Sequence, residues 1–126
     1  MDSLKFQAVC NDLGLPYASD WGIINADKAR IVEFIDYVTQ RESLDFSIKY
    51  NFLELIIASM NDAIVEGEVD YKLHAKFHEY VKPVLKDDRY YPHIPYWISI
   101  KSKDEFPIGF LLEQYLRDAT EGIESS

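Results

Sequence analysis

The sequence predicts an all-α protein, a bundle of four to five helices in a single domain spanning residues 1–126. The length of 126 residues suits one domain, and a hydrophobic content of 48% is enough for a buried core. The dominant spacing of apolar residues is that of an α-helix, and capping or turn residues separate the helical segments by short connections. An irregular array of helix pairs is the alternative architecture.

The first helix is expected over residues 4–13, with Ser3 as its N-cap. Gly14 follows the last apolar residue and can adopt the left-handed conformation that ends many helices. Pro16 then prevents the helix from continuing.

The second helix is expected to begin after Asn25 and to end near Arg41. In the loop before it, Trp21, Ile23 and Ile24 are expected to hold the connection onto the core. Four apolar residues fall on one stripe of this helix at the spacing i, i+3, i+4 and i+7: Ile31, Phe34, Ile35 and Val38.

The third helix, expected over residues 46–66, is the most apolar segment and is ended by Gly67. Its apolar residues cover more than one face, which predicts contacts from several directions. They are Ile48, Phe52, Leu53, Leu55, Ile56, Ile57, Met60, Ala63 and Ile64.

Asp70 is expected to cap a fourth helix over residues 71–85, which kinks or stops at Pro83. β-Branched residues predict a short, irregular extended segment near residues 96–101. The last helix is expected to begin at Asp104 as N-cap, with its buried stripe at Ile108, Leu111, Leu112, Tyr115 and Leu116, and to end at Gly122. The last few residues are expected to form a loose tail.

The charge balance points to a basic partner. Thirteen basic and 22 acidic side chains give a net charge of −9 and an isoelectric point near 4.7. Such a field repels nucleic acids and anionic membranes, and it speeds encounter with basic proteins. A solubility role is the alternative explanation of the same charge.

Cysteine usage favours the cytoplasm, because Cys10 is the single cysteine and cannot form an internal disulfide. The N-terminal residues lack the basic start and apolar block of a signal peptide. No apolar run reaches the ~20 residues that cross a bilayer.

No catalytic motif is evident, so we expect a protein that is not an enzyme and that needs no cofactor. There is no GxSxG nucleophile motif and no glycine-rich phosphate loop. A small metalloprotein is one alternative, because His74 and His78 lie one helical turn apart and Glu79 or His93 could supply a third ligand.

Acidic residues concentrate after the third helix. Between residues 51 and 71 there are five acids and no lysine or arginine, and four of them gather at the end of the third helix and in the loop after it: Asp62, Glu66, Glu68 and Asp70. Carboxylates near a helix C-terminus oppose the helix dipole, so local stability does not explain them. A solvated acidic loop and an interaction face for a basic partner are both consistent with this pattern.

The stretch DDRYYPHIPYW, residues 87–97, carries four large aromatic residues, two prolines and two leading carboxylates. In one interpretation Tyr91, Ile94 and Trp97 fill the core while Tyr90 and Tyr96 point outward. In a second, the stretch is a rigid interaction hot spot, because Tyr, Trp and Arg dominate interface energetics. A small-ligand pocket is the third interpretation. Residues assigned to partner binding are Tyr90, Tyr91, Tyr96, Trp97, Asp87, Asp88, Glu66, Glu68 and Asp70.

Tyr90-Tyr91-Pro92, followed by the helix-forming segment DEFPIGFLLEQYLRDATEG, resembles the arrangement in the immunity proteins of DNase colicins and pyocins, which are bacterial. The resemblance covers about a quarter of the chain. It implies a small acidic four-helix protein in which Tyr90 and Tyr91 match the two partner-binding tyrosines of that family. The resemblance also implies that the acidic helix of the family corresponds to part of the second or third helix here, although no motif identifies the residues.

The sequence therefore favours a cytoplasmic, non-enzymatic inhibitor of the immunity or antitoxin type, which covers the surface of a basic toxin or nuclease domain and binds neither nucleic acid nor membrane. Acidic side chains replace nucleic-acid phosphates, and rigid aromatic residues anchor the complex. A helical adaptor that binds a partner helix is a second alternative. A viral mimic of nucleic acid is a further alternative, because such a protein would also be small and acidic.

Overall fold

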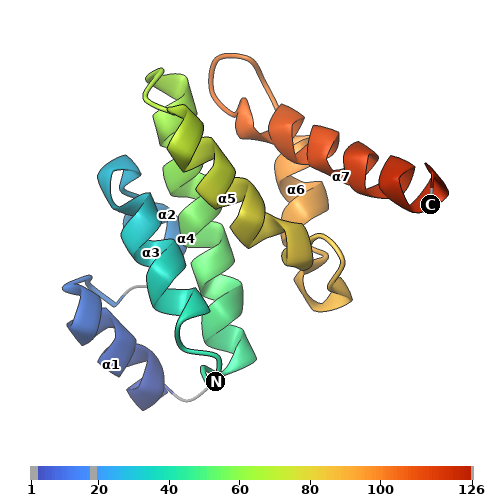
Figure 1. The fold of residues 1–126 in the computed structure, drawn as a ribbon. Coiled ribbons are helices and arrows are strands. Elements are labelled where there is room, and N and C mark those ends of the chain that lie inside the picture. Colours follow the sequence, from blue (N-terminus) through green and yellow to red (C-terminus); the bar gives the residue numbers. More distant parts are fainter. Residues whose placement is uncertain (1–2, 18–19, 126) are drawn as a thin grey trace. The chain divides into compact units, whose positions relative to one another are not determined.

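The computed structural model describes residues 3–17 and 20–125, and over these residues the chain is helical and contains no strand (Figure 1). The α-helices are α1 (Ser3–Leu13), α2 (Trp21–Ile24), α3 (Ile31–Thr39), α4 (Phe46–Val65), α5 (Tyr71–Val84), α6 (His93–Ser99) and α7 (Ile108–Ser125). Two 3₁₀ turns, η1 (Lys28–Arg30) and η2 (Asp88–Tyr90), precede α3 and α6. The all-α class is confirmed. The described residues form more helices than expected because two short ones, α2 and α6, occupy segments predicted to be irregular.

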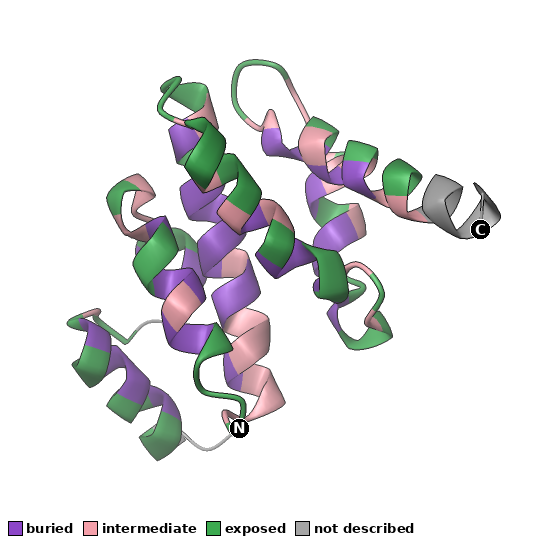
Figure 2. Cartoon of the chain, viewed as in Figure 1, coloured by how far each residue is buried: buried purple, intermediate pink, exposed green. Residues whose placement is uncertain are grey.

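The chain divides into two compact units, Met1–Ser59 and Met60–Ser126, and the division falls inside α4. The expectation of a single domain stays a prediction. Most of α4 is buried on more than one side, as Figure 2 shows by colour. Phe52, Leu53, Leu55, Ile56, Ile57 and Met60 are all fully buried. The predicted many-sided burial of this helix is therefore confirmed.

An aromatic cluster forms the core of the first unit. The ring of Trp21 meets Phe6 edge-on at a centroid distance of 5.0 Å and Phe52 at 5.3 Å. Tyr37 stacks on Phe52 at 5.6 Å, and its hydroxyl donates to Asp12 Oδ2 over 2.9 Å. Trp21 thus fixes the connection as predicted.

The other two residues expected to hold that connection, Ile23 and Ile24, are exposed. The following helix also begins later than expected. The side chain of Asn25 donates to the backbone of Trp21, and Asp27 is the residue that caps η1 by accepting from Ala29 N. The chain then passes from η1 into α3.

Two glycines end helices as the sequence predicts. Gly14 after α1 and Gly67 after α4 both have φ of 68°. After α4, the N–H of Glu68 donates to Ala63 O over 2.9 Å and the N–H of Gly67 donates to Ile64 O over 3.0 Å. This pair of bonds satisfies the last carbonyls of α4 and requires a left-handed residue, which glycine adopts without steric cost.

Three predicted boundaries need correction in the second unit. Residues 96–99 belong to α6 instead of an extended segment, because burial of the α6 inner face outweighs the β-propensity of single residues. Asp104 lies in the bend before α7 and is not the cap of that helix. The backbone of α7 continues through Gly122 to Ser125, since a helix accepts an internal glycine at a cost of about 1 kcal/mol. By contrast, α5 ends at Val84, directly after Pro83, as expected.

Candidate partner-binding surface

The predicted partner-binding stretch forms a helical corner in the second unit. Asp87 caps η2, and its side chain accepts from the backbone N–H of Arg89 over 3.0 Å. The Arg89 guanidinium also donates to both carboxylate oxygens of Asp87, over 3.0 and 2.7 Å. These bonds hold the pKa of Asp87 below its ordinary value. Asp87 therefore serves the local fold, whereas the neighbouring Asp88 is exposed.

The four aromatic residues of this corner divide into two buried and two exposed side chains. Tyr90 and Trp97 are 8% and 3% exposed, whereas Tyr91 and Tyr96 are 68% and 57% exposed. The expectation that Tyr90 points outward and Tyr91 inward is wrong. Tyr91 and Pro92 continue the helical conformation from η2 into α6, so Tyr90 falls in phase with Ile94 and Trp97 at i, i+4 and i+7.

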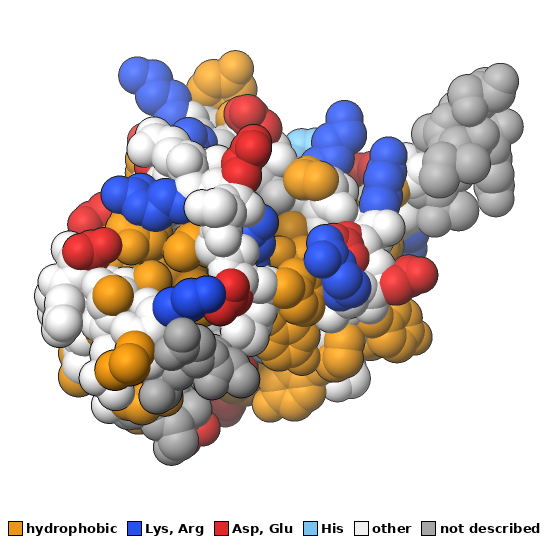
Figure 3. All heavy atoms as spheres, turned by 90° about the horizontal axis from the view of Figure 1, so that it is seen from below, with side chains coloured by type: hydrophobic (Ala, Val, Ile, Leu, Met, Phe, Trp, Pro, Cys, Tyr) orange, Lys and Arg blue, Asp and Glu red, His pale blue; other side chains and the backbone are white. Residues whose placement is uncertain are grey.

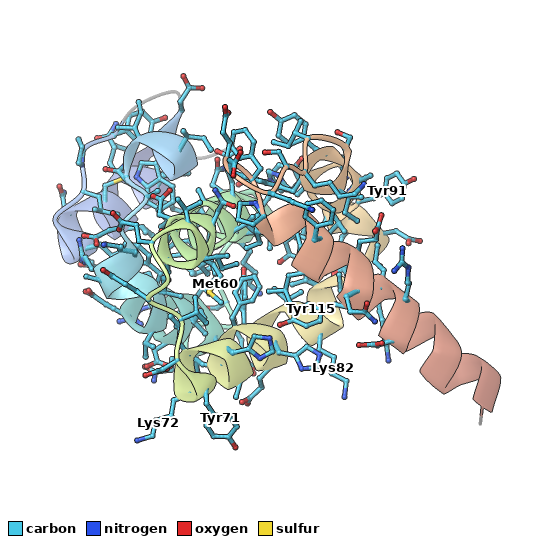
Figure 4. All side chains as sticks on the ribbon, turned by 90° about the horizontal axis from the view of Figure 1, so that it is seen from above. Met60, Tyr71, Lys72, Lys82, Tyr91 and Tyr115 are labelled. Atoms are coloured by element: carbon cyan, nitrogen blue, oxygen red, sulfur yellow. The ribbon has the colours of Figure 1, made fainter. Side chains whose placement is uncertain are left out.

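The exposed part of this corner, which we call the Tyr–Pro face, consists of Tyr91, Pro92, Tyr96 and Ser99. No residue between positions 90 and 100 is a lysine, arginine, aspartate or glutamate. The Tyr–Pro face itself therefore carries no charged side chain, and exposed Asp88 and Arg89 lie directly before it in the chain. In Figure 4, Tyr91 points away from the helices.

The first turn of α7 fixes the C-terminal end of α6. A Cβ atom on Gly109 would lie 2.4 Å from Trp97 O and 2.4 Å from Lys101 Cβ, so only glycine allows this approach. The ring of Trp97 also meets Phe106 at a centroid distance of 6.0 Å. The Tyr–Pro face is thus carried by a helix whose position leaves little freedom.

A buried amide that sequence reasoning missed holds the loop between α6 and α7. Asn61, 5% exposed on α4, donates from Nδ2 to Glu105 O over 2.8 Å and accepts at Oδ1 from Ile108 N over 3.2 Å. It satisfies one of the free N–H groups at the start of α7, the role predicted for Asp104. The signal in the sequence is an asparagine beside the apolar face of α4.

The predicted acidic residues do not gather beside the Tyr–Pro face. Glu66 and Glu68 are exposed in the loop before α5, and the side chain of Asp70 accepts from Leu73 N over 2.8 Å as the N-cap of that helix. Asp87 follows the opposite end of α5, a helix of 14 residues and hence about 21 Å long. The acidic loop and the aromatic corner are therefore separated by the length of α5.

The exposed surface of α5 is basic. Lys72 and Lys82 are exposed, Lys76 is half-buried, and Glu79 is the one acidic residue of the helix. Figure 4 shows Lys72 beside Tyr71 at one end of α5. On the face of the molecule in Figure 3, both signs of charge are interspersed with hydrophobic side chains. The acidic excess is present in both units, with nine acids and five bases in residues 1–59 and thirteen acids and eight bases in residues 60–126.

The histidine pair considered as a metal site packs on Tyr115, which Figure 4 labels on α7. The ring of His78 stacks on Tyr115 at a centroid distance of 4.4 Å, and His74 Nε2 lies 3.2 Å from the Tyr115 hydroxyl. Burial raises the pKa of Tyr115 to about 12, so its hydroxyl keeps its proton at neutral pH. Among the described residues, no group of three or more His, Cys, Asp or Glu side chains could hold a metal ion. His93 is buried on the inner face of α6.

Comparison of the chain with family models, curated proteins and solved structures finds no significant match. Within residues 3–17 and 20–125, no helix is long and apolar enough to cross a membrane. The resemblance to immunity proteins stays a prediction.

Proposed function

We propose that this protein is a non-enzymatic inhibitor of the immunity type, which binds a basic toxin such as a nuclease and covers its active or substrate-binding surface. The observation that carries the proposal is the Tyr–Pro face, where Tyr91 and Tyr96 are exposed on a firmly held helix. Exposed aromatic residues on a rigid element bind with little loss of conformational entropy, and tyrosine is enriched among interface hot spots.

Electrostatics support a basic partner. The net charge of −9 attracts cationic proteins over a distance, and both units contribute to it. Near the Tyr–Pro face, Asp88 supplies an exposed carboxylate, and Glu66 and Glu68 supply two more at the other end of α5. Asp70 and Asp87 act mainly as helix caps, so we assign them a smaller part in binding. The single cysteine supports a cytoplasmic location.

A helical adaptor is the second candidate, and the uncharged character of the Tyr–Pro face favours it. A partner helix that packs its apolar side on Tyr91 and Tyr96 would bind with little dependence on salt. An inhibitor drawn in by the net charge would instead bind more weakly as salt rises.

The test is capture of a partner from cell lysate on three immobilised proteins: the native chain, the double variant Tyr91→Ala/Tyr96→Ala, and the control Tyr71→Ala. Tyr71 is 86% exposed at the opposite end of α5, so its loss removes a tyrosine of similar exposure from outside the proposed face. The inhibitor function predicts a basic protein that elutes with salt and whose toxic or nuclease activity is suppressed by the native chain and by Tyr71→Ala. The double variant should retain less partner and suppress less activity.

Kinetics with the captured partner separate the two candidates. Tyr91→Ala should raise the dissociation rate, with the association rate unchanged, because the aromatic contact forms after encounter. Asp88→Lys should lower the association rate and flatten its salt dependence. A partner that stays bound through high salt would favour the adaptor, and binding equal for all variants would exclude the Tyr–Pro face as the site.

A further inference from the structure

A half-buried carboxyl group lies against the backbone of a short helix in the first unit. Glu54 is on α4, and a Cβ atom built on Gly22 of α2 would lie 2.7 Å from Glu54 Oε1 and 3.0 Å from Glu54 Cβ. These separations are shorter than side-chain contacts normally allow. The Glu54 side chain therefore rests on α2 at the one residue that leaves space for it.

The charged surroundings of Glu54 are acidic. The four residues of α2 carry no ionisable group, and Asp20, directly before α2, acts on Glu54 by charge repulsion. On α4, the residues one turn from Glu54 are Tyr50, Asn51, Ile57 and Ala58, none of them charged at neutral pH. Among the described side chains, no lysine or arginine forms a salt bridge with Glu54.

Burial, followed by repulsion from Asp20, raises the pKa of Glu54 above its ordinary value. The docked position of α2 is therefore more compatible with the neutral carboxyl than with the carboxylate. A second contact, between Trp21 and the rings of Phe6 and Phe52, anchors the same helix without any ionisable group.

We infer that the contact between α2 and α4 is a pH-sensitive latch, in which α2 is held most firmly while Glu54 is protonated and loosens when Glu54 ionises beside Asp20. The ring of Trp21 stays packed on Phe6 and Phe52 in both states, so the latch controls local opening of the part of α2 that follows Trp21. The pH dependence of the contact follows from the raised pKa of Glu54. Stabilisation by the neutral carboxyl is complete below the ordinary range of a glutamate and is lost as pH rises through the raised pKa.

Hydrogen exchange of the full chain, followed by NMR between about pH 4 and pH 8, measures the latch. The amides of Ile24 and Asn25 report on it, because they donate to Asp20 O over 2.9 Å and to Trp21 O over 3.1 Å. After correction for intrinsic exchange, their protection should fall several-fold from mildly acidic to neutral pH. The chemical shift of the Gly22 amide should titrate with a midpoint above the ordinary glutamate value, about 4.3.

Three variants test the assignment. Glu54→Gln should keep protection of α2 high and independent of pH, and Asp20→Asn should move the Gly22 midpoint downward by removing the repulsion. Glu42→Gln removes one exposed carboxylate from the same unit and should leave both observations unchanged. The latch is wrong if Glu54→Gln retains the native pH profile, or if the Gly22 midpoint lies at or below the ordinary value. Asp20→Asn changes an exposed position, so it tests the latch even where Glu54→Gln does not fold: an unchanged Gly22 midpoint would overturn the latch.

Discussion

The two shortest α-helices, α2 and α6, are built alike but fixed differently. Each is anchored by one buried tryptophan, Trp21 at 2% exposure and Trp97 at 3%, and each meets a neighbouring helix at a glycine. At α6 the glycine is Gly109 of the neighbouring helix α7, and it packs against the backbone of Trp97. At α2 the glycine belongs to the short helix itself and meets the side chain of Glu54. A backbone contact fixes position under all conditions, whereas a carboxyl contact changes with protonation.

The largest expected effect on stability comes from removing either of the two buried tryptophans. Trp21→Ala and Trp97→Ala should each lower the free energy of unfolding by about 4 kcal/mol, because both remove a large, fully packed ring. Urea denaturation followed by circular dichroism measures the loss. Ile24→Ala and Tyr96→Ala, on the exposed sides of the same helices, should stay within about 0.5 kcal/mol of the native chain. A large loss at those exposed positions would mean that the two helices are not held by their tryptophans.

The contact at α6 should tolerate a methyl group poorly. Gly109→Ala places a Cβ 2.4 Å from Trp97 O, and backbone cannot move away as a side-chain tip can. We expect a loss of about 3 kcal/mol in the free energy of unfolding, the upper end of overpacking costs. Calorimetry at two pH values checks both size and cause, since the loss should not depend on pH. If Gly109→Ala lowered the free energy of unfolding by less than Gly22→Ala does, the proposed difference between the contacts at α6 and α2 would be wrong.

The equivalent change at α2 should cost less. Gly22→Ala meets Glu54 side-chain atoms at 2.7 to 3.0 Å, and that side chain can rotate toward solvent. We expect a net loss of about 1 kcal/mol in the free energy of unfolding, because the better helix propensity of alanine partly offsets the cost of overpacking. In addition, the pH dependence of α2 protection should shrink, because Glu54 leaves its contact. Hydrogen exchange of the variant, compared with Glu54→Gln, distinguishes a displaced carboxyl from general loosening.

Local chemistry made some features predictable from sequence. Gly14 and Gly67 end helices through a backbone conformation that glycine adopts freely, and Asp70 caps α5 through its own side chain. The predicted orientations of Tyr90 and Tyr91 are wrong because the buried residue is Tyr90, one position earlier in the chain. Which tyrosine is buried depends on where the helical turn before α6 begins. That starting point is set by the packing of the inner face, which local propensity does not contain.

The role of Asn61 was out of reach for a different reason. Its hydrogen-bond partners, Glu105 and Ile108, are 44 and 47 residues further along the chain. A polar residue beside an apolar helix face indicates that some partner exists, but only the fold brings that partner near. For the aromatic corner, the sequence predicts the exposure of Tyr96 and the burial of Trp97, but it places Tyr91 in the core, where the structure has Tyr90 instead. The assignment of these residues to partner binding stays a prediction.

The single cysteine gives the first unit a reporter of its own motion. Cys10 is 2% exposed on α1 and lies beside Trp21, and burial raises the pKa of its thiol. A thiol reagent can therefore react only in the fraction of molecules that have transiently opened, and reaction requires the thiolate. The labelling rate at Cys10 counts those openings in the native chain without any added probe. The same experiment therefore measures how often the part of the first unit around α1 opens.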